Sequence, residues 1–346
     1  MTSEIWNRVI DPCRTFVIAE AGVNHNGELA LAQELVMAAK KSGADLVKFQ
    51  IFQPELLASS EAGQAEYQAR NCGTRPQLEM IKEWELDESE LQQLADFCRF
   101  TGIAFTASPF DLASVDALDR LGVPFIKIPS GEITHPQLLA RIGRLHRPVV
   151  LSTGMADLSE VREAVSCLKT SGTRDLVLLQ CTSCYPTCME DVNLRAMLTM
   201  KKEWELPVGF SDHTLGIDAV LAAVALGAVV IEKHLTLDRT MKGPDHAASL
   251  EPAEFAEMVR RIRNIELALG SGEKKPAAAE ADVARVARRS LVAANVIPRG
   301  TIIEEKHIAI KRPGTGLAPS DLARVVGMRA RIEIPADRIL AWEMFE

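Results

Sequence analysis

Residues 206–237 read LPVGFSDHTLGIDAVLAAVALGAVVIEKHLTL, and this stretch decides the fold. It holds an apolar run at 206–214, a segment with helical spacing at 217–226 and a second apolar run at 228–237. Near-continuous apolar strands separated by a helix pair in parallel, because a parallel connection needs a crossover. The stretch therefore predicts one strand–helix–strand unit.

The same unit repeats along the chain. The segments between the apolar runs, such as 29–41, 88–101 and 158–169, carry apolar residues three and four positions apart and are predicted as amphipathic helices. The eight apolar runs lie at 15–22, 44–52, 103–110, 124–132, 148–155, 175–183, 206–214 and 228–237. Eight such units within about 250 residues favour an α/β fold of the (β/α)₈ TIM-barrel type. An open doubly wound sheet is the alternative, but no G-x-G-x-x-G opens the first helix.

The composition changes after the last long helical segment, 252–269. Residues 270–280 read GSGEKKPAAAE, which is typical of a linker. A β-rich module follows, with apolar runs at 290–293, 302–303, 307–311 and 330–334. A module of about 60 residues is marginal for an independent core, so we expect it to dock on another surface. The predicted division is a barrel at 1–270, a linker at 271–283 and a small domain at 284–346.

Composition and charge exclude several classes of partner. The 346 residues are 47% hydrophobic and 25% charged, the balance of an ordinary globular protein. The net charge is −8 and no basic block is present, so we expect neither nucleic acid nor membrane as a partner. No stretch reaches the roughly 18 apolar residues of a membrane span, and residues 1–14 carry no cleavage signal. We expect a cytoplasmic protein that acts on small molecules.

Three of the seven cysteines, Cys181, Cys184 and Cys188, fall close together. An odd number at irregular spacing in a reducing compartment predicts free thiols. The C-x-x-C-x-x-x-C pattern resembles a metal ligand set, but structural zinc sites usually take four ligands from separated pairs. Cys181 is predicted within a strand and the other two in the loop beyond it. We therefore expect no metal on these cysteines.

Polar side chains gather where the predicted strands end. Active sites of TIM barrels lie at the carboxyl ends of the strands, so we expect these residues to meet at one mouth. They are Glu20, Lys48, Gln50, Thr106, Ser108, Lys127, Ser130, Glu132, Ser152, Ser183, Tyr185, Ser211, His213, Glu232 and His234.

His213 and His234 end consecutive strands, and neighbouring strands lie about 4.8 Å apart. Both imidazoles can therefore reach one divalent cation at about 2.0–2.2 Å, with carboxylate, water or substrate oxygens completing the shell. The alternative is that the two histidines only form hydrogen bonds inside the mouth. This ligand set does not choose between Mn²⁺, Zn²⁺, Co²⁺ and Mg²⁺.

Lys48 and Lys127 each lie inside an apolar run, where a lysine without a counter-charge is costly. Beside several serines they indicate a bound anion, most simply phosphate or carboxylate. One alternative is a Schiff-base lysine, and another is structural pairing with Glu20 and Glu132. The same glutamates are candidates for general acid or base. Asp245 follows the eighth strand and is either a residue that reaches over the mouth or an ordinary surface aspartate.

Eight motifs in order resemble those of the sialic acid synthases (N-acetylneuraminate synthases), a family that includes the legionaminate synthases. They are IAEAGVNHNG at 18–27, VKFQ at 47–50, KIPSGE at 127–132, LSTGM at 151–155, GFSDHT at 209–214, IEKH at 231–234, GPDH at 243–246 and KRPGTG at 311–316. The resemblance covers essentially the whole chain. It implies a barrel followed by an antifreeze-like (SAF) domain, in a domain-swapped homodimer whose small domains cap the partner's barrel.

The resemblance also implies a reaction. Members condense phosphoenolpyruvate with an open-chain N-acetylated amino sugar, N-acetylmannosamine for the sialic acid synthases, and water, to give N-acetylneuraminate and phosphate. C3 of phosphoenolpyruvate attacks the aldehyde, water attacks C2, and phosphate leaves with C–O cleavage. A divalent metal, Mn²⁺ with Mg²⁺ or Co²⁺ as alternatives, polarises the aldehyde. This replaces the Schiff-base interpretation, because an enol ether nucleophile needs no lysine imine.

The roles that the resemblance implies are distributed over the mouth of the barrel. His213 and His234 hold the metal, and Glu20 and Glu132 handle the water and its protons. Phosphoenolpyruvate is bound by Lys48, Ser108, Lys127, Ser130, Ser152, Ser183 and Ser211. The sugar is held by Gln50, Asn71, Tyr185 and Asp245, with Arg312 supplied by the partner's small domain.

Two other functions remain as alternatives. An N,N'-diacetyllegionaminate synthase would take 2,4-diacetamido-2,4,6-trideoxymannose, while a pseudaminate synthase fits the GPDH motif less well. From a different class, a non-catalytic glycan-binding protein would have lost some of Glu20, Lys48, Lys127, His213 and His234, and the sequence retains all of these.

Overall fold

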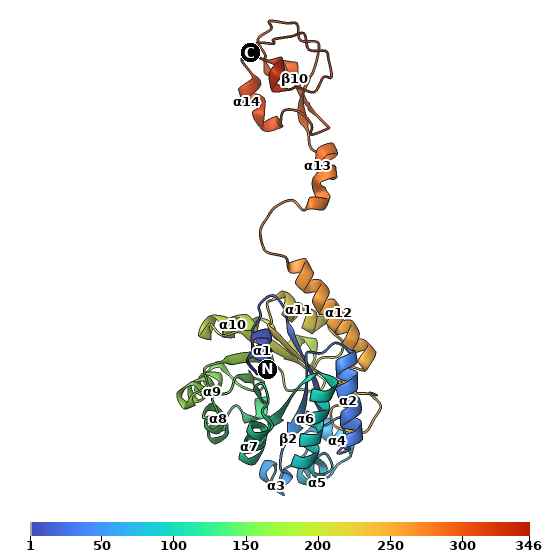
Figure 1. Cartoon of the computed structure of the whole chain (residues 1–346), viewed down its shortest axis with the longest axis vertical. Helices are drawn as coiled ribbons and strands as arrows, with labels where there is room; N and C mark the ends of the chain where they lie inside the picture. The colour runs from blue at the N-terminus through green and yellow to red at the C-terminus, as the bar shows by residue number, and fades with distance from the viewer. Residues whose placement is uncertain (1) are drawn as a thin grey trace. The chain divides into compact units, whose positions relative to one another are not determined.

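The computed structural model describes residues 2–346, which pack into two units. The first unit ends at Gly270 and the second spans Ser271–Glu346 (Figure 1). Within the described residues, no helix has both the length and the apolar character that crossing a membrane requires.

The first unit is a TIM barrel, as predicted. Its eight strands are β1 (Phe16–Gly22), β2 (Leu46–Ile51), β3 (Ala104–Pro109), β4 (Ile126–Ile128), β5 (Val149–Ser152), β6 (Leu176–Cys181), β7 (Val208–Asp212) and β8 (Val230–His234). They form one sheet in the order β3-β2-β1-β8-β7-β6-β5-β4, and all the paired strands are parallel. Because β1 pairs with β8, the first and last strands are neighbours and the alternative of an open doubly wound sheet is wrong. Each strand lies within its predicted apolar run.

The barrel closes between β3 and β4 through a side chain. The hydroxyl of Thr106 in β3 donates to the carbonyl of Phe125, directly before β4, at 2.8 Å. Thr106 is fully buried, so this bond lies out of water. It joins the two edge strands where the backbone ladder is interrupted.

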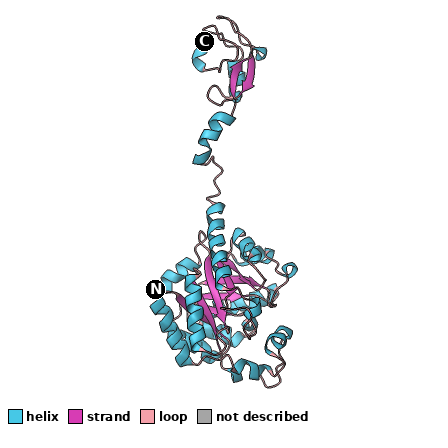
Figure 2. Ribbon diagram, turned by 90° about the vertical axis from the view of Figure 1, so that its right-hand side faces the viewer, coloured by secondary structure: helices cyan, strands magenta, loops and turns pink. Residues whose placement is uncertain are grey.

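Helices surround the sheet on its outer face (Figures 1 and 2). Several of these helices begin at a residue whose side chain caps the helix. Asp157, for example, accepts hydrogen bonds from the backbone N–H groups of Ser159 and Glu160 at 2.8 and 3.0 Å. The helices that follow the strands are α2 (Leu29–Lys41), α6 (Glu88–Thr101), α7 (Leu112–Leu121), α8 (Pro136–Gly143), α9 (Leu158–Ser171), α10 (Arg195–Trp204), α11 (Asp218–Ala225) and α12 (Pro252–Leu269).

Four short helices of the first unit were not anticipated from the sequence. One is α1 (Thr2–Val9), whose Trp6 packs with Phe16 and Phe125 inside the barrel. The others, α3 (Pro54–Leu57), α4 (Glu66–Cys72) and α5 (Gln77–Lys82), lie between β2 and α6. This segment between β2 and α6 has an apolar cluster of its own, formed with Val23 by Phe52, Ala58, Met80, Ile81 and Trp84.

The alternation of side chains between the two faces of each strand determines where the buried polar side chains lie. Within the barrel, an apolar cluster fills the end where the strands begin; its strand residues include Phe16, Ile18, Leu46, Val150, Val177, Leu179 and Val230. Two positions further along the same strands come Glu20, Lys48, Ser152, Cys181 and Glu232, which are also buried. Because residues two apart in a strand share a face, these polar side chains point into the barrel, directly above the apolar cluster.

The second unit has an antiparallel pair, β9 (Ser290–Ala293) with β10 (Ile308–Lys311), and the short helices α13 (Ala281–Ala287) and α14 (Leu322–Val325). Its own apolar core includes Leu291, Ile297, Ile303, Val325, Ile334 and Leu340. Residues 271–283, predicted as a linker, include a 3₁₀ turn at Ala278–Glu280 and the start of α13.

Replacing Thr106 tests the side-chain closure. Thr106→Val keeps the shape but leaves the Phe125 carbonyl without its donor, so the free energy of unfolding in urea should fall by about 1–3 kcal/mol. Thr170→Val, which removes a hydroxyl bond to Ser166 on an exposed helix, is the matched control and should change it by less than about 0.5 kcal/mol. Equal stability of the two variants would contradict this account of closure.

Candidate active site

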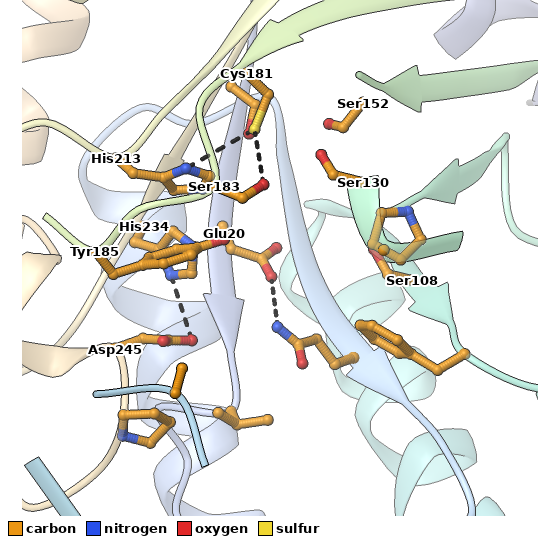
Figure 3. Close-up of a pocket in the computed structure, with 18 of the residues that line it drawn as sticks. Glu20, Ser108, Ser130, Ser152, Cys181, Ser183, Tyr185, His213, His234 and Asp245 are labelled. Carbon is orange, nitrogen blue, oxygen red and sulfur yellow. Dashed lines mark hydrogen bonds and ion pairs between the residues drawn. The ribbon is translucent and has the colours of Figure 1, made fainter. Parts of the chain in front are cut away.

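A cavity of about 440 Å³ opens at the carboxyl ends of the barrel strands (Figure 3). This volume is in the range of small-molecule sites, roughly 300–1,000 Å³. Most of the predicted site residues line it: Glu20, Lys48, Gln50, Ser108, Lys127, Ser130, Ser152, Ser183, Tyr185, Ser211, His213, His234 and Asp245. The barrel thus brings together residues from all eight strands or the loops that follow them.

Lys48 lies on the floor of the cavity and is buried. Its ammonium group lies 2.6 Å from Glu20 Oε2 and donates to Ser108 Oγ at 2.8 Å. Glu232 Oε2 lies 3.8 Å away. Lys48 therefore has two carboxylates to balance its charge. The alternative of structural pairing holds for Glu20, whereas the second carboxylate is Glu232 and not the predicted Glu132.

Lys127 is the second buried ammonium group. It donates to Ser152 Oγ at 2.8 Å and lies 3.4 Å from Glu232 Oε1. The Ser211 hydroxyl donates to the same carboxylate oxygen at 2.9 Å. Glu232 therefore lies between the two lysines and is the counter-charge that they share.

The two carboxyl groups differ in their pKa because their neighbours differ. Burial raises the pKa of Glu20 to about 7, against the opposing effect of Lys48. Burial also acts to raise the pKa of Glu232, but Lys127 and Lys48 outweigh it and hold that pKa below its ordinary value. Glu232 is thus a fixed anion, whereas Glu20 exchanges its proton near neutral pH.

His213 and His234 face one another on the opposite side of the cavity, with ring centroids 5.3 Å apart. Tyr185 packs against both rings, at 4.1 Å from His213 and 5.7 Å from His234 (Figure 3). Nδ1 of His213 donates to the Thr182 carbonyl at 2.8 Å, so Nε2 is the ring nitrogen left for another partner. Nδ1 of His234 is buried and has no hydrogen-bond partner among residues 2–346, and Asp245 Oδ2 lies 3.9 Å from it.

These imidazoles fit a divalent cation. Burial and the nearby His213 hold the pKa of His234 well below its ordinary range, so this ring is neutral, the form that binds metal. With nitrogen–metal distances of about 2.1 Å, two rings at the observed spacing can share one ion. Within residues 2–346 no group of three or more His, Cys, Asp or Glu side chains forms a ready ligand set, so water or substrate oxygens would complete the shell.

Four predicted residues do not line this cavity. Thr106, expected at the mouth, lies in β3 and donates instead to the Phe125 carbonyl. Glu132 lies in a 3₁₀ turn (Ser130–Glu132) and its carboxylate contacts His135 Nδ1 at 2.7 Å. Asn71 donates to the Pro244 carbonyl at 2.8 Å and so ties α4 to the loop that carries Asp245. Arg312 lies in the second unit, where it donates to the Ala287 carbonyl at 3.0 Å.

Some lining residues had been given no role from the sequence, among them Glu232, Tyr67 and Cys181. Glu232 was expected at the mouth, and it shares a strand face with His234, which it precedes by two positions. Tyr67 on α4 stacks on Tyr185 with centroids 5.1 Å apart, and no periodic pattern marks its segment. Cys181 lies in β6 with Sγ 3.8 Å from His213 Nδ1, whereas Cys184 and Cys188 are exposed.

Comparison with known proteins gives matches along most of the chain. The sequence model of the NeuB family matches residues 35–274, and that of the SAF domain matches residues 288–346. The chain is 47% identical to N,N'-diacetyllegionaminic acid synthase of Legionella pneumophila, over 96% of this chain and 94% of that protein. It is 36% identical to human N-acetylneuraminate-9-phosphate synthase, over 97% of this chain and 93% of that protein.

A solved structure shows the same similarity. The crystal structure of N-acetylneuraminic acid (sialic acid) synthetase from Leptospira borgpetersenii, in complex with citrate, has a TM-score of 0.70 and 36% sequence identity. The match covers 78% of this chain and 90% of that one.

Asp245→Asn tests the burial of a carboxyl group at the mouth. Burial raises the pKa of Asp245 from 3.8 to about 6, so the folded protein holds a proton there that the unfolded chain releases earlier as pH rises. The free energy of unfolding therefore falls as pH rises from the pKa of the unfolded chain to that of the folded protein. Asparagine does not titrate, so the variant does not show this fall. Relative to the parent protein, the variant should gain up to about 3 kcal/mol of unfolding free energy between pH 4 and pH 8.

Urea denaturation at the two pH values measures the difference. Asp191→Asn, at an exposed position of the same barrel, is the control and should change stability equally at both. A pH-independent effect of Asp245→Asn would show that this carboxyl group is not protonated by burial.

Proposed function

The chain belongs to the NeuB family of sialic acid and legionaminic acid synthases and carries a SAF domain, and we propose that it condenses phosphoenolpyruvate with the open-chain form of an N-acetylated amino sugar. The other reactant is water, and the products are a nine-carbon 2-keto acid and inorganic phosphate. One observation carries the proposal: a buried pair of lysines and a pair of imidazoles face the same cavity. The family relationship to named synthases argues against the glycan-binding alternative.

The lysine side of the cavity suits phosphoenolpyruvate. Lys48 and Lys127 offer two positive charges, and the nearby hydroxyls are those of Ser108, Ser130, Ser152, Ser183 and Ser211. Gly154 lets two of these serines approach, because a Cβ on this residue would lie 2.3 Å from Ser183 Oγ and 2.8 Å from Ser130 Oγ. Several donors around fixed positive charge are the arrangement that a phosphate and a carboxylate on one small molecule need.

The imidazole side suits the sugar aldehyde. His213 and His234 would hold a divalent cation, for which Mn²⁺ is our first choice and Mg²⁺ or Co²⁺ the alternatives. When bound, such an ion supplies Lewis-acid polarisation of a carbonyl. Tyr185, Asp245 and Gln50 line the cavity around these rings and would orient the sugar.

The chemical steps use groups at both sides. C3 of phosphoenolpyruvate forms a bond to the aldehyde carbon, whose oxygen takes a proton and becomes a hydroxyl. Water adds to C2, and the C2–O bond to phosphate then breaks as the new C2 hydroxyl loses its proton and becomes the ketone. Glu20, with its pKa of about 7, lies beside Lys48 and is the group on this floor best suited to accept the proton of the water. The corresponding role of Glu132 stays a prediction.

The apolar wall of the cavity favours one acceptor. Val23, Phe52, Leu57, Ile81, Trp84 and Phe110 line it. The 6-deoxy and second acetyl groups of 2,4-diacetamido-2,4,6-trideoxymannose present methyls to such a wall, where the 6-hydroxyl of N-acetylmannosamine would lose hydrogen bonds. Identity of 47% to a legionaminic acid synthase, against 36% to a human sialic acid-9-phosphate synthase, favours the same choice. N-acetylmannosamine, the first choice from the sequence, is the second candidate.

We further propose a domain-swapped homodimer in which Arg312 of the small domain reaches the partner's sugar site. The matched SAF domain supports this proposal, since the expected capping role belongs to that domain.

Phosphate release from phosphoenolpyruvate tests the function. With Mn²⁺ present, 2,4-diacetamido-2,4,6-trideoxymannose should give a kcat/KM at least about tenfold above that of N-acetylmannosamine, because each buried hydroxyl without a partner costs about 1–3 kcal/mol. N-acetylmannosamine 6-phosphate is the third acceptor in the comparison. Release with none of the three would overturn the synthase proposal, and a preference for N-acetylmannosamine would restore the first choice.

A second variant locates the sugar. Tyr185→Ala should raise the KM for the sugar by up to about tenfold and leave that for phosphoenolpyruvate nearly unchanged, since packing against an aromatic ring contributes about 0.5–1.5 kcal/mol. Its control is Cys184→Ser with Cys188→Ser, which changes exposed thiols of the same loop and should leave both KM values as they are. An unchanged sugar KM in Tyr185→Ala would place the acceptor elsewhere.

The affinity for phosphoenolpyruvate should depend on the protonation of Glu20. Below pH 7 the neutral carboxyl group leaves the lysine charges free for the anion, and above pH 7 its charge competes, so the Kd should rise as pH increases from 6 to 8.5. Glu20→Gln mimics the protonated form and should remove this part of the pH dependence. Titration of both proteins without sugar isolates the effect, because ionisation of the ligand itself is common to both. Identical profiles would exclude Glu20 as the titrating group.

A further inference from the structure

The two residues directly before the imidazoles form an ion pair that faces away from the cavity. Asp212 and Lys233 are 1% and 0% exposed, and Lys233 Nζ donates to Asp212 Oδ2 at 2.6 Å. The two are direct partners in the register of β7 and β8. Because neighbouring residues of a strand point to opposite faces, this pair lies on the outer side of the sheet while His213 and His234 lie on the inner side.

The pair also forms hydrogen bonds to the backbone of Thr214, the residue after His213. The Asp212 carboxylate accepts from the Thr214 N–H at 2.9 Å and from the Thr214 hydroxyl at 3.1 Å. Lys233 donates to the Thr214 carbonyl. His213 thus lies between Asp212, a member of the ion pair, and Thr214, to which both members of the pair are hydrogen-bonded.

This pair is the last link between β7 and β8 before the imidazoles. On the inner face one step earlier, Ser211 donates to Glu232 at 2.9 Å. The backbone register of the two strands ends at Asp212 and Lys233, so His213 lies one residue past the end of β7. The spacing of the two rings therefore depends on what fixes the strand ends at this point.

Stability alone is a poor explanation for such a pair. Taking both charges out of water costs several kcal/mol per ion, and replacement of a buried pair by apolar residues is often neutral or stabilising. The neighbouring outward residues Val208, Phe210 and Ile231 belong to the apolar layer between sheet and helices, which a further apolar pair would extend. The directional contacts to Thr214 are what an apolar pair would not supply.

We propose that Asp212 and Lys233 are positioning residues that hold His213 and His234 at the spacing needed to share one divalent cation. The inference rests on the metal role in the proposed function. The ion pair does not touch the cation or the substrate and acts through the backbone of the two strand ends.

The test is a double replacement that keeps the outer layer filled. Asp212→Leu with Lys233→Met removes both charges, and urea denaturation should give an unfolding free energy close to that of the parent protein, whereas each single change should be strongly destabilising. Binding of Mn²⁺ alone, followed by the electron paramagnetic resonance signal of the free ion, should weaken about 10- to 100-fold in the double variant. The affinity for phosphoenolpyruvate, which depends on lysines of β2 and β4, should stay within about twofold.

A matched control removes a buried carboxylate at the other end of the barrel. Asp45, directly before β2, is paired with Arg263 at 3.1 Å, and Asp45→Leu with Arg263→Met should leave Mn²⁺ affinity unchanged even where stability falls. If the first double variant does not fold, Asp212→Asn with Lys233→Met, which nearly preserves the shape of both side chains, is tested in its place. Its affinity for Mn²⁺ should also be weaker than that of the parent protein.

The outcomes separate the two proposals. Parent protein that binds Mn²⁺ and a stable double variant that binds it equally well would overturn the positioning role and leave the proposed function intact. Parent protein that releases phosphate but binds no Mn²⁺ would overturn the positioning role together with the metal part of the function. Weaker Mn²⁺ binding with unchanged phosphoenolpyruvate affinity supports the inference.

Discussion

The charge of two buried lysines governs the cavity of this barrel. Lys48 and Lys127 point inward above an apolar floor, where water cannot stabilise them, and Glu232 lies within 3.4 Å of one and 3.8 Å of the other. One carboxylate cannot balance two ammonium groups. Glu20 balances the second positive charge only when it is ionised, and its pKa lies near neutrality. When Glu20 is protonated, such a site carries one excess positive charge among side chains that are almost fully buried, where a small anion is attracted more strongly than in water.

The same strands serve stability and chemistry with different residues. Their first inward positions close the barrel with an apolar cluster, and their last inward positions carry the polar groups. The outward positions are almost entirely apolar and pack against the helices; the buried polar exceptions include Gln180, Asp212 and Lys233. A barrel therefore tolerates costly groups at its mouth because they are few and lie above a core that does not depend on them.

Periodicity explains how much of this was visible in the sequence. The apolar runs predicted the eight strands and the convergence of their polar ends. A strand that is buried on both faces appears in the sequence as one nearly continuous apolar run. Glu232 was expected at the mouth by the same reasoning, but its role as the counter-charge of both lysines was not predicted. Tyr67 was not expected at the mouth, because its position depends on α4, a short helix held by a local cluster with no period along the chain. Glu132 shows a further limit: it follows Ser130 by two positions, yet a 3₁₀ turn after β4 directs it to His135.

The segment between β2 and α6 packs around its own apolar cluster, apart from the core that joins the strands to the outer helices. It supplies four of the six residues of the apolar wall, namely Phe52, Leu57, Ile81 and Trp84, while the lysines and serines that line the cavity come from the strands and the turns or loops that follow them. Substitutions in this segment can therefore accumulate without disturbing the barrel. Such a division lets a lineage change the sugar that it accepts while the phosphate chemistry is inherited unaltered, which makes the acceptor the most evolvable property of this architecture.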